Sequence, residues 1–162
     1  MRKSKEKEFE KLYAQYKDSV FCVSLMYLKD YQLAEDATQE TFIKVLSKLR
    51  SLKEESKAKA WISKIAINVC RDKLRHSSKR EIPSQTLPED AAHSSHTDLR
   101  LTVGEAIGKL DPKLRETVIL HYYQGFTHQE IADILRIPLS TVGYRLRTAK
   151  AQLKDFLKED IR

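Results

Sequence analysis

The fold is decided by Gly125-Phe-Thr-His-Gln-Glu-Ile-Ala-Asp-Ile-Leu135 and by the segment that follows it, Arg136-Ile-Pro-Leu-Ser140-Thr-Val142. Thr127 and Glu130 have the spacing of a capping box, in which each side chain accepts a hydrogen bond from the other residue's backbone N–H. The sequence therefore predicts a short helix after the box, a tight turn, and a second helix with Ser140 as its N-cap. A short helix, a tight turn and a longer basic helix are the layout of a helix-turn-helix.

The second helix of this pair is expected to bury one side and to expose a basic one. Five basic residues and no acid lie between Arg136 and Lys154. Basic side chains suit phosphates, and side chains opposite the apolar stripe could reach base edges in a major groove. A capped helical hairpin without DNA is the alternative. The expected apolar stripe is Val142, Leu146, Ala149, Leu153 and Leu157, and the candidate DNA-binding residues are Ser140, Thr141, Tyr144, Arg147, Thr148 and Lys150.

The helix upstream of this pair has its own start and stop signals. Asp111 is a good N-cap, and Pro112 suits the first helical position. Gly125 is expected to end the helix in the left-handed region, which glycine adopts without steric cost. The apolar residues expected on its inner side are Leu114, Val118, Ile119 and Tyr122.

The first 82 residues contain neither glycine nor proline, the two residues that most often interrupt regular structure. Apolar residues recur there at steps of three and four, which predicts three amphipathic helices. Their stripes run from Phe9 to Leu28, from Leu33 to Leu49 and from Trp61 to Val69.

A polar segment, residues 81–100, separates these helices from the C-terminal ones. It carries two prolines, a net charge of −3 and no apolar period, as expected of a flexible linker. We therefore predict an all-α protein with two small helical lobes, residues 1–80 and 101–162, joined by a flexible linker over residues 81–100.

Composition excludes several classes of protein. The net charge is +7 over 162 residues, and no apolar run is long enough to span a bilayer. No signal peptide is expected, and Cys22 and Cys70 are too far apart in sequence to indicate a zinc site or a disulfide framework. His93 and His96 are a poor metal pair without further ligands. Gly-rich phosphate loops, nucleophile elbows and HExxH are absent, so we expect a cytoplasmic protein that is not an enzyme and has no metal or cofactor.

Two helix faces outside the apolar stripes carry polar clusters. The second predicted helix has Asp36, Gln39, Glu40 and Ile43 on one face, with Phe42 at its border. The third has Asn68, Arg71, Asp72 and Arg75 on one face, which Lys79 and Arg80 continue. For an isolated cluster, a solvated helix face is the usual explanation, and a basic face alone supports only weak, salt-sensitive attraction to phosphates.

Several of these segments resemble bacterial sigma factors. Region 2 of that family is similar to Ala34-Glu-Asp-Ala-Thr-Gln-Glu-Thr-Phe42-Ile-Lys-Val-Leu46 and to Ala60-Trp-Ile-Ser-Lys-Ile-Ala-Ile-Asn68-Val-Cys-Arg-Asp72-Lys-Leu-Arg75. Region 4 is similar to Leu110-Asp-Pro-Lys-Leu-Arg-Glu116 and to the helix-turn-helix segments quoted above. The two regions follow each other with only a linker between them and no region 3, as in the extracytoplasmic-function (ECF) group of the sigma-70 family.

This resemblance implies a function and a set of binding residues. The chain would bind RNA polymerase core, through the β′ clamp helices and the β flap, and direct initiation from specific promoters in response to envelope or other stress. An anti-sigma factor, often membrane-anchored, would hold it inactive. The resemblance implies core binding by Asp36, Gln39, Glu40 and Phe42, capture of the unpaired −10 strand by Asn68, Arg71, Arg75 and Lys79, and −35 recognition by the helix that begins near Thr141.

Three residues depart from the family pattern. Gly143 and Tyr144 replace a basic residue and a serine, which indicates an individual −35 preference. Arg136 stands at a turn position that glycine often fills. A second hypothesis remains, that of a stand-alone helix-turn-helix regulator whose N-terminal lobe binds a ligand or dimerises. Such a protein would have no affinity for core polymerase.

Overall fold

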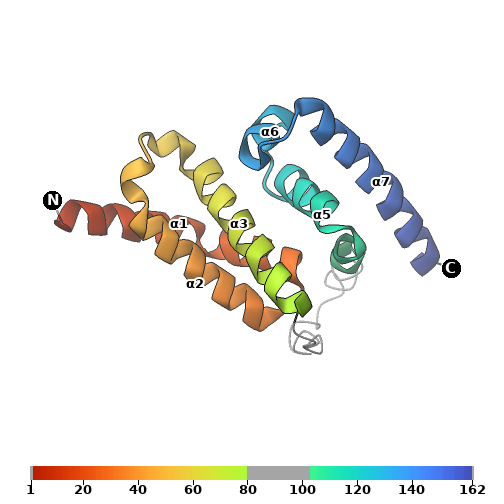
Figure 1. The fold of residues 1–162 in the computed structure, drawn as a ribbon, viewed down its shortest axis with the longest axis horizontal. Coiled ribbons are helices and arrows are strands. Elements are labelled where there is room, and N and C mark those ends of the chain that lie inside the picture. The colour runs from red at the N-terminus through yellow and green to blue at the C-terminus, as the bar shows by residue number, and fades with distance from the viewer. Residues whose placement is uncertain (1, 80–102, 162) are drawn as a thin grey trace. The chain divides into compact units, whose positions relative to one another are not determined.

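A computed structural model of the chain describes residues 2–79 and 103–161. The chain divides into two compact units, one within Met1–Gln85 and the other within Thr86–Arg162, and each has its own core (Figure 1). The described residues contain helices and turns but no strand, so the predicted all-α class is confirmed. The predicted linker, residues 81–100, lies outside the described part of the chain.

The first unit consists of three long helices and two short 3₁₀ turns. Two residues join the first helix to the second: Lys29, with φ of 57°, and Asp30, whose side chain accepts a hydrogen bond from Leu33 N at 2.9 Å. Such a cap satisfies a backbone N–H that the first turn of a helix leaves without a partner. The elements are α1 (Arg2–Leu28), α2 (Tyr31–Ser47), η1 (Leu49–Ser51), η2 (Glu55–Lys57) and α3 (Ala58–Lys79).

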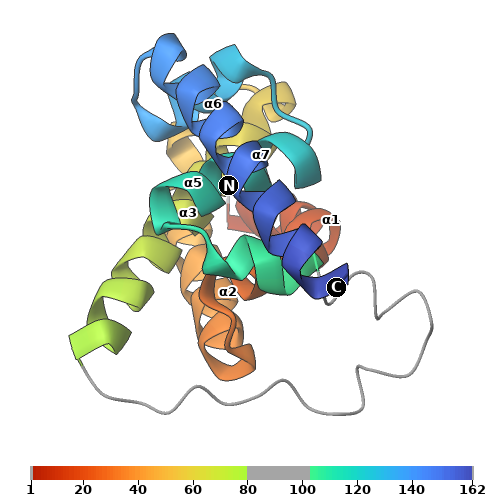
Figure 2. The ribbon, with the colours of Figure 1, turned by 90° about the vertical axis from the view of Figure 1, so that its right-hand side faces the viewer.

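The three helices pack on one another around an apolar core, as Figures 1 and 2 show from two sides. Tyr27, Val45 and Val69 are buried in it, one from each helix. Trp61, at the edge of the third apolar stripe, is only half-buried. Outside the core, the exposed side chains of Lys11 and Glu55 form an ion pair, and the hydrogen bond to the Glu55 carboxylate raises the pKa of Lys11. The ion pair between Lys11 and Glu55 adds little to the free energy of unfolding, because both of its side chains are exposed to solvent. Most of the stability of this unit therefore comes from the burial of its apolar side chains.

The second unit contains the predicted helix-turn-helix, α6 (His128–Leu135) and α7 (Leu139–Ile161). Before it come α5 (Pro112–Val118) and η4 (Ile119–Tyr123), a π-helical turn. Residues 103–109 form a further helix that the sequence patterns did not predict, with Ala106 and Ile107 buried. α7 packs along α5 and α6, which encloses the core of this unit (Figure 1).

Three of the predicted helix signals are confirmed. Asp111 caps α5, with Pro112 at the first helical position. Gly125 has φ of 77°, in the left-handed region. In the capping box, Glu130 N donates to the Thr127 hydroxyl at 3.1 Å, and Thr127 N donates to the Glu130 carboxylate at 3.0 Å. These local rules hold because each one satisfies backbone groups without help from the rest of the fold.

Ser140 was wrongly predicted as the N-cap of α7. The helix begins one residue earlier, at Leu139. The carbonyl of Pro138 accepts hydrogen bonds from Thr141 N at 3.0 Å and Val142 N at 3.3 Å, so the first turn closes without a hydroxyl cap. Ser140 consequently stands on the exposed surface of the first turn.

Tyr122 was expected on the apolar side of its helix and is instead 61% exposed. The cause is η4, where Gln124 N donates to Ile119 O, five residues back, at 3.0 Å. A π-helical turn contains more residues than an α-helical turn, so side chains within it, Tyr122 among them, leave the 3.6-residue period. The 3.6-residue spacing therefore does not predict burial here, because the helix changes from α-helical to π-helical at Ile119.

Candidate nucleic-acid and protein interfaces

The exposed side of α2 carries an apolar residue among polar ones. Ile43 is 67% exposed, and Leu46, one turn further along, is also exposed. Gln39 is exposed beside them, and Asp36 is half-buried, with its Oδ1 accepting a hydrogen bond from Gln32 Nε2 at 3.4 Å. Apolar residues surrounded by polar ones are typical of a protein-binding surface. Ile43 and Leu46 extend the set of candidate residues predicted from the sequence.

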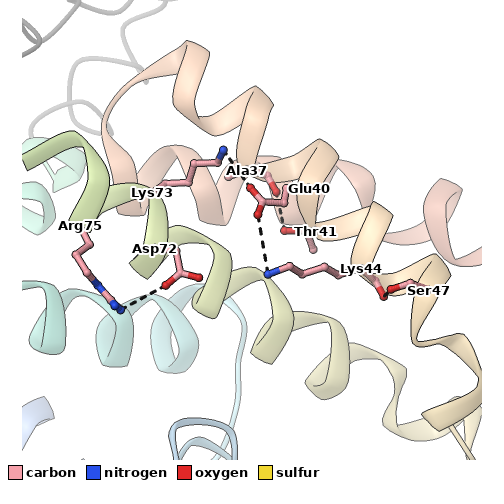
Figure 3. A network of polar contacts seen from close by, with 8 residues as sticks. All are labelled: Ala37, Glu40, Thr41, Lys44, Ser47, Asp72, Lys73 and Arg75. Carbon is pink, nitrogen blue, oxygen red and sulfur yellow. Dashed lines mark hydrogen bonds and ion pairs between the residues drawn. The ribbon is translucent and has the colours of Figure 1, made fainter. Parts of the chain in front are cut away.

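Glu40 lies at the side of α2 that faces α3, and it is joined to two lysines (Figure 3). Lys73 of α3 places its Nζ 3.0 Å from Oε2 of Glu40. Lys44, one turn further along α2, places its Nζ 3.9 Å from Oε1. In the same region, the Thr41 hydroxyl donates to the Ala37 carbonyl at 2.7 Å, which allows a polar side chain inside the core. The structure thus brings three of the four predicted core-binding residues, Asp36, Gln39 and Glu40, to accessible positions on α2.

Phe42 does not lie on the surface that it was predicted to border. Its side chain is 4% exposed and packs edge-on against the ring of Tyr13, with ring centroids 5.0 Å apart. Phe9 adds a second edge-on contact at 6.4 Å. Phe42 therefore belongs to an aromatic cluster that attaches α2 to α1, and its role is in packing.

The face of α3 opposite the core is polar and mostly basic. Asn68 and Arg75 are exposed there, and Arg71 is half-buried. Asp72 offsets part of this charge, since its Oδ1 lies 3.3 Å from Nη2 of Arg75 (Figure 3). The side chain of Lys79 lies outside the described residues. The three described residues predicted to bind DNA thus share one side of α3.

The predicted recognition helix, α7, buries one side and exposes the other. Val142 and Ala149 are fully buried, whereas Tyr144 is 62% exposed. Gly143 leaves room for the side chain of Arg147, because a Cβ atom at this residue would lie only 3.2 Å from Nη1 of Arg147. The guanidinium of Arg147 can therefore lie over the helix backbone at Gly143. Of the other predicted residues, Ser140 and Lys150 are exposed, and Thr141 and Thr148 are half-buried.

Buried charged groups hold the helices of the second unit in place. Arg115 is buried and donates hydrogen bonds to the carbonyls of Gly108 at 2.7 Å and Leu110 at 2.9 Å, which joins α5 to the end of the helix over residues 103–109. Glu116 is 2% exposed, with Oε1 4.0 Å from Nη1 of Arg145 on α7. The sequence patterns did not single out these residues. The adjacent Arg and Glu in an apolar stretch were the only signal, because buried charges are rare unless paired.

The turn before α7 uses a strained residue. Arg136 adopts φ of 55° and ψ of 50°, the left-handed conformation that glycine fills more easily. Ile137 N then donates to the Ala132 carbonyl at 3.1 Å, which closes the end of α6. The departure from glycine at this position is thus accommodated with a regular turn.

Two other kinds of site are absent from residues 2–79 and 103–161. No group of three or more His, Cys, Asp or Glu residues is placed to hold a metal ion. None of the described helices is both long and apolar enough to cross a membrane.

Two family models match the chain, one for each unit. Sigma-70 region 2 matches residues 12–80, and sigma-70 region 4 matches residues 100–153. Together they span about three quarters of the chain. The chain belongs to the sigma-70 family.

Other members of the sigma-70 family match along nearly the whole chain. The RNA polymerase sigma-H factor of Pseudomonas aeruginosa is 24% identical, over 100% of this chain and 92% of its own length. The ECF RNA polymerase sigma factor SigW of Bacillus subtilis is 27% identical, over 98% of this chain and 94% of its own length.

Two solved structures have the same fold. The sigma factor RpoE of Bartonella quintana, crystallised with the anti-sigma factor NepR, aligns with a TM-score of 0.80 at 24% identity, over 94% of this chain and 98% of that one. CnrH, solved with the cytosolic domain of CnrY, aligns with a TM-score of 0.73 at 23% identity, over 96% of this chain and 90% of that one. At such identities these likenesses establish the fold and nothing further.

Proposed function

We propose that this member of the sigma-70 family is an alternative sigma factor of the ECF type, which binds RNA polymerase core and directs it to a specific set of promoters. The observation that carries the proposal is the presence of a region 2 unit and a region 4 unit in one chain, with matches that end at residue 80 and resume at residue 100. Several relatives that match over almost the whole chain are named as ECF sigma factors. A sigma factor has no catalytic chemistry of its own, and it needs no cofactor for this role.

The first unit would supply polymerase binding. We assign the docking surface on the β′ clamp helices to the exposed side of α2, with Asp36, Gln39 and Glu40 as predicted and with Ile43 in addition. An exposed isoleucine amid polar groups supports this assignment, because apolar residues at the centre of an interface and polar ones at its rim are the usual arrangement.

The same unit would capture the melted −10 element on α3. Pulling a base from the stack costs a few kcal/mol of free energy. Contacts of the protein with the edge and the face of that base must offset this cost. Asn68 has the hydrogen-bonding groups to hold such a base. Arg71, Arg75 and Lys79 would neutralise the phosphates of the single strand.

The second unit would read the −35 duplex and contact the β flap. The outward side of α7 would enter a major groove, with the exposed Tyr144 and Arg147 at its centre and the half-buried Thr148 beside them. Side chains that reach base edges would specify the sequence, and those that reach phosphates would set the register. The assigned residues are Ser140, Thr141, Tyr144, Arg147, Thr148 and Lys150.

An anti-sigma factor, possibly membrane-anchored, would hold the protein inactive until a stress signal, from the envelope or elsewhere, releases it. The solved structure of the sigma factor RpoE with the anti-sigma factor NepR supports a partner of this class. The free protein would then act on promoters in the cytoplasm, at the bacterial nucleoid. A stand-alone helix-turn-helix regulator is not favoured, because the region 2 match covers almost the entire first unit.

Purification with core polymerase, followed by run-off transcription on a promoter library, tests the function. Stoichiometric binding and initiation from a subset of promoters are expected. Recognition of duplex DNA without binding to core would discard the sigma-factor function and favour the regulator.

A further inference from the structure

One carboxylate in the first unit is shared between the two helices to which we assign polymerase binding and DNA capture. Oε2 of Glu40, on α2, lies 3.0 Å from Nζ of Lys73 on α3, and Oε1 lies 3.9 Å from Nζ of Lys44 (Figure 3). The Lys73 side chain is 27% exposed and that of Glu40 is 41% exposed, so water reaches this pair only in part. Partial burial strengthens an ion pair relative to one in open solvent.

Lys73 does not belong to the basic face of α3. At 100° per residue it stands about 140° from Asn68, on the side that packs against α2. Arg75 lies on the other side, within 3.3 Å of Asp72 on the same helix (Figure 3). The two cations are thus separated: Arg75 faces outward, and Lys73 crosses to α2.

We infer that Lys73 and Glu40 form a strut that sets the position of α2 on α3, and that Glu40 supports polymerase binding through this strut instead of by touching the polymerase. The inference rests on the proposed function and refines the role of Glu40 within it. A basic group of the polymerase would meet a carboxylate whose two oxygens already face lysines. Gln39 and Ile43, in contrast, are exposed and available for direct contact. Lys73 is then a positioning residue of the docking surface, although it lies on the helix to which DNA capture is assigned.

A charge exchange distinguishes a strut from a direct contact. The dissociation constant for core polymerase is measured for the full-length wild type, for Glu40→Lys, for Lys73→Glu and for the double variant. Each single variant brings like charges together, three lysines in Glu40→Lys and two carboxylates in Lys73→Glu, and is expected to weaken binding by about tenfold. The double variant restores an opposite pair with reversed direction and is expected to bind within about threefold of the wild type. Lys44 stands beside the new lysine in both Glu40→Lys and the double variant, so its effect cancels when these two variants are compared with each other, and the repulsion that it adds relative to the wild type is small for a pair one helical turn apart.

Lys11 and Glu55 provide the matched control, since they form an ion pair in the same unit with both side chains more than 60% exposed. Lys11→Glu changes the net charge as Lys73→Glu does, and it is expected to leave the affinity for core unchanged. The unfolding midpoint is recorded for every variant. If Lys73→Glu fails to fold, Lys73→Gln replaces it, because it removes the charge without placing two carboxylates together. In that series Lys73→Gln is expected to weaken binding, and adding Glu40→Gln to it is expected to weaken binding no further.

Two results would overturn the inference while leaving the function intact. A double variant that binds as weakly as Glu40→Lys would mean that the polymerase contacts Glu40 directly. Wild-type affinity in a folded Lys73→Glu variant would mean that the strut does not position α2. If the wild type itself does not bind core, the proposed function fails, and the role of the strut fails with it.

Discussion

Phe42 and Ile43 are neighbours in the chain with opposite surroundings. Phe42 packs in the aromatic cluster, and Ile43 stands in solvent. We expect Phe42→Ala to destabilise the first unit by about 3–5 kcal/mol, since it leaves a cavity in the core. Its affinity for core polymerase should fall only as the unit unfolds. Ile43→Asp should weaken polymerase binding with little change in stability.

Thermal unfolding and a binding titration, run on the same preparations, separate the two effects. Tyr144→Asp is the control for Ile43→Asp, because it introduces the same charge at a similarly exposed residue of the other unit. Wild-type affinity of Ile43→Asp for core would remove this residue from the docking surface.

Arg147 is the residue of α7 for which we expect the largest effect on −35 recognition. Arg147→Ala is expected to lower the affinity for −35 duplex by roughly 1–3 kcal/mol if the guanidinium contacts a base, while binding to core is unchanged. Lys158→Ala, at an exposed position beyond the region 4 match, serves as the control. Loss of both activities in Arg147→Ala would indicate unfolding.

At this scale, the sequence was sufficient to find candidate residues but not to rank them. Helical spacing placed Gln39, Asn68 and Arg147 on outward faces, because 100° per residue fixes direction once a helix exists. It also placed Phe42 at the border of such a face. Only the packing of α1 on α2 decides that this ring lies inside, and such a contact joins residues about thirty positions apart.

Two hydroxyl residues of the helix-turn-helix test the capping of its helices. Thr127→Ala is expected to cost about 1 kcal/mol, because it leaves the backbone N–H of Glu130 without its partner. Ser140→Ala should leave stability nearly unchanged, since α7 begins at Leu139. Denaturant unfolding of both variants measures the difference. Equal losses would mean that Ser140 does cap α7.

The turn between α6 and α7 provides a second test among these elements. Arg136→Gly is expected to raise stability by up to about 1 kcal/mol, because glycine adopts positive φ without the steric cost of a side chain. Arg136→Ala keeps that cost and is the control for loss of the arginine side chain. A stability gain of equal size in both variants would assign the effect to charge and not to backbone strain.

Elements with local signals were predicted well, and those without them were not. The box at Thr127 and Glu130, the cap at Asp111 and the turn at Gly125 each depend on a few neighbouring residues. The helix over residues 103–109 was not predicted, and its end depends on Arg115, five or more positions away, for hydrogen bonds to the carbonyls of Gly108 and Leu110. The π-helical turn has no signal in the sequence. Its extra residue becomes apparent only in the structure, where Tyr122, which helical spacing places on the buried side, is exposed.

The two units have separate cores, so we expect the whole molecule to unfold in two transitions. In differential scanning calorimetry, Phe42→Ala should lower the midpoint of one transition, and Thr127→Ala should lower that of the other. A single transition that both variants shift equally would mean that the units unfold together. The family models, which match each unit separately, agree with this division.

The turn η4 has a consequence for how such proteins can diversify. It holds one more residue than an α-helical turn, so removal of a single codon between Ile119 and Tyr123 would leave a regular helix in its place. A π-helical turn and an α-helical turn each complete about 360°, so the shorter turn would leave the chain downstream with the same direction about the helix axis. Insertions and deletions at this one place are therefore an evolutionary route to changing which side chains the turn exposes, Tyr122 among them, while the directions of α6 and α7 stay the same.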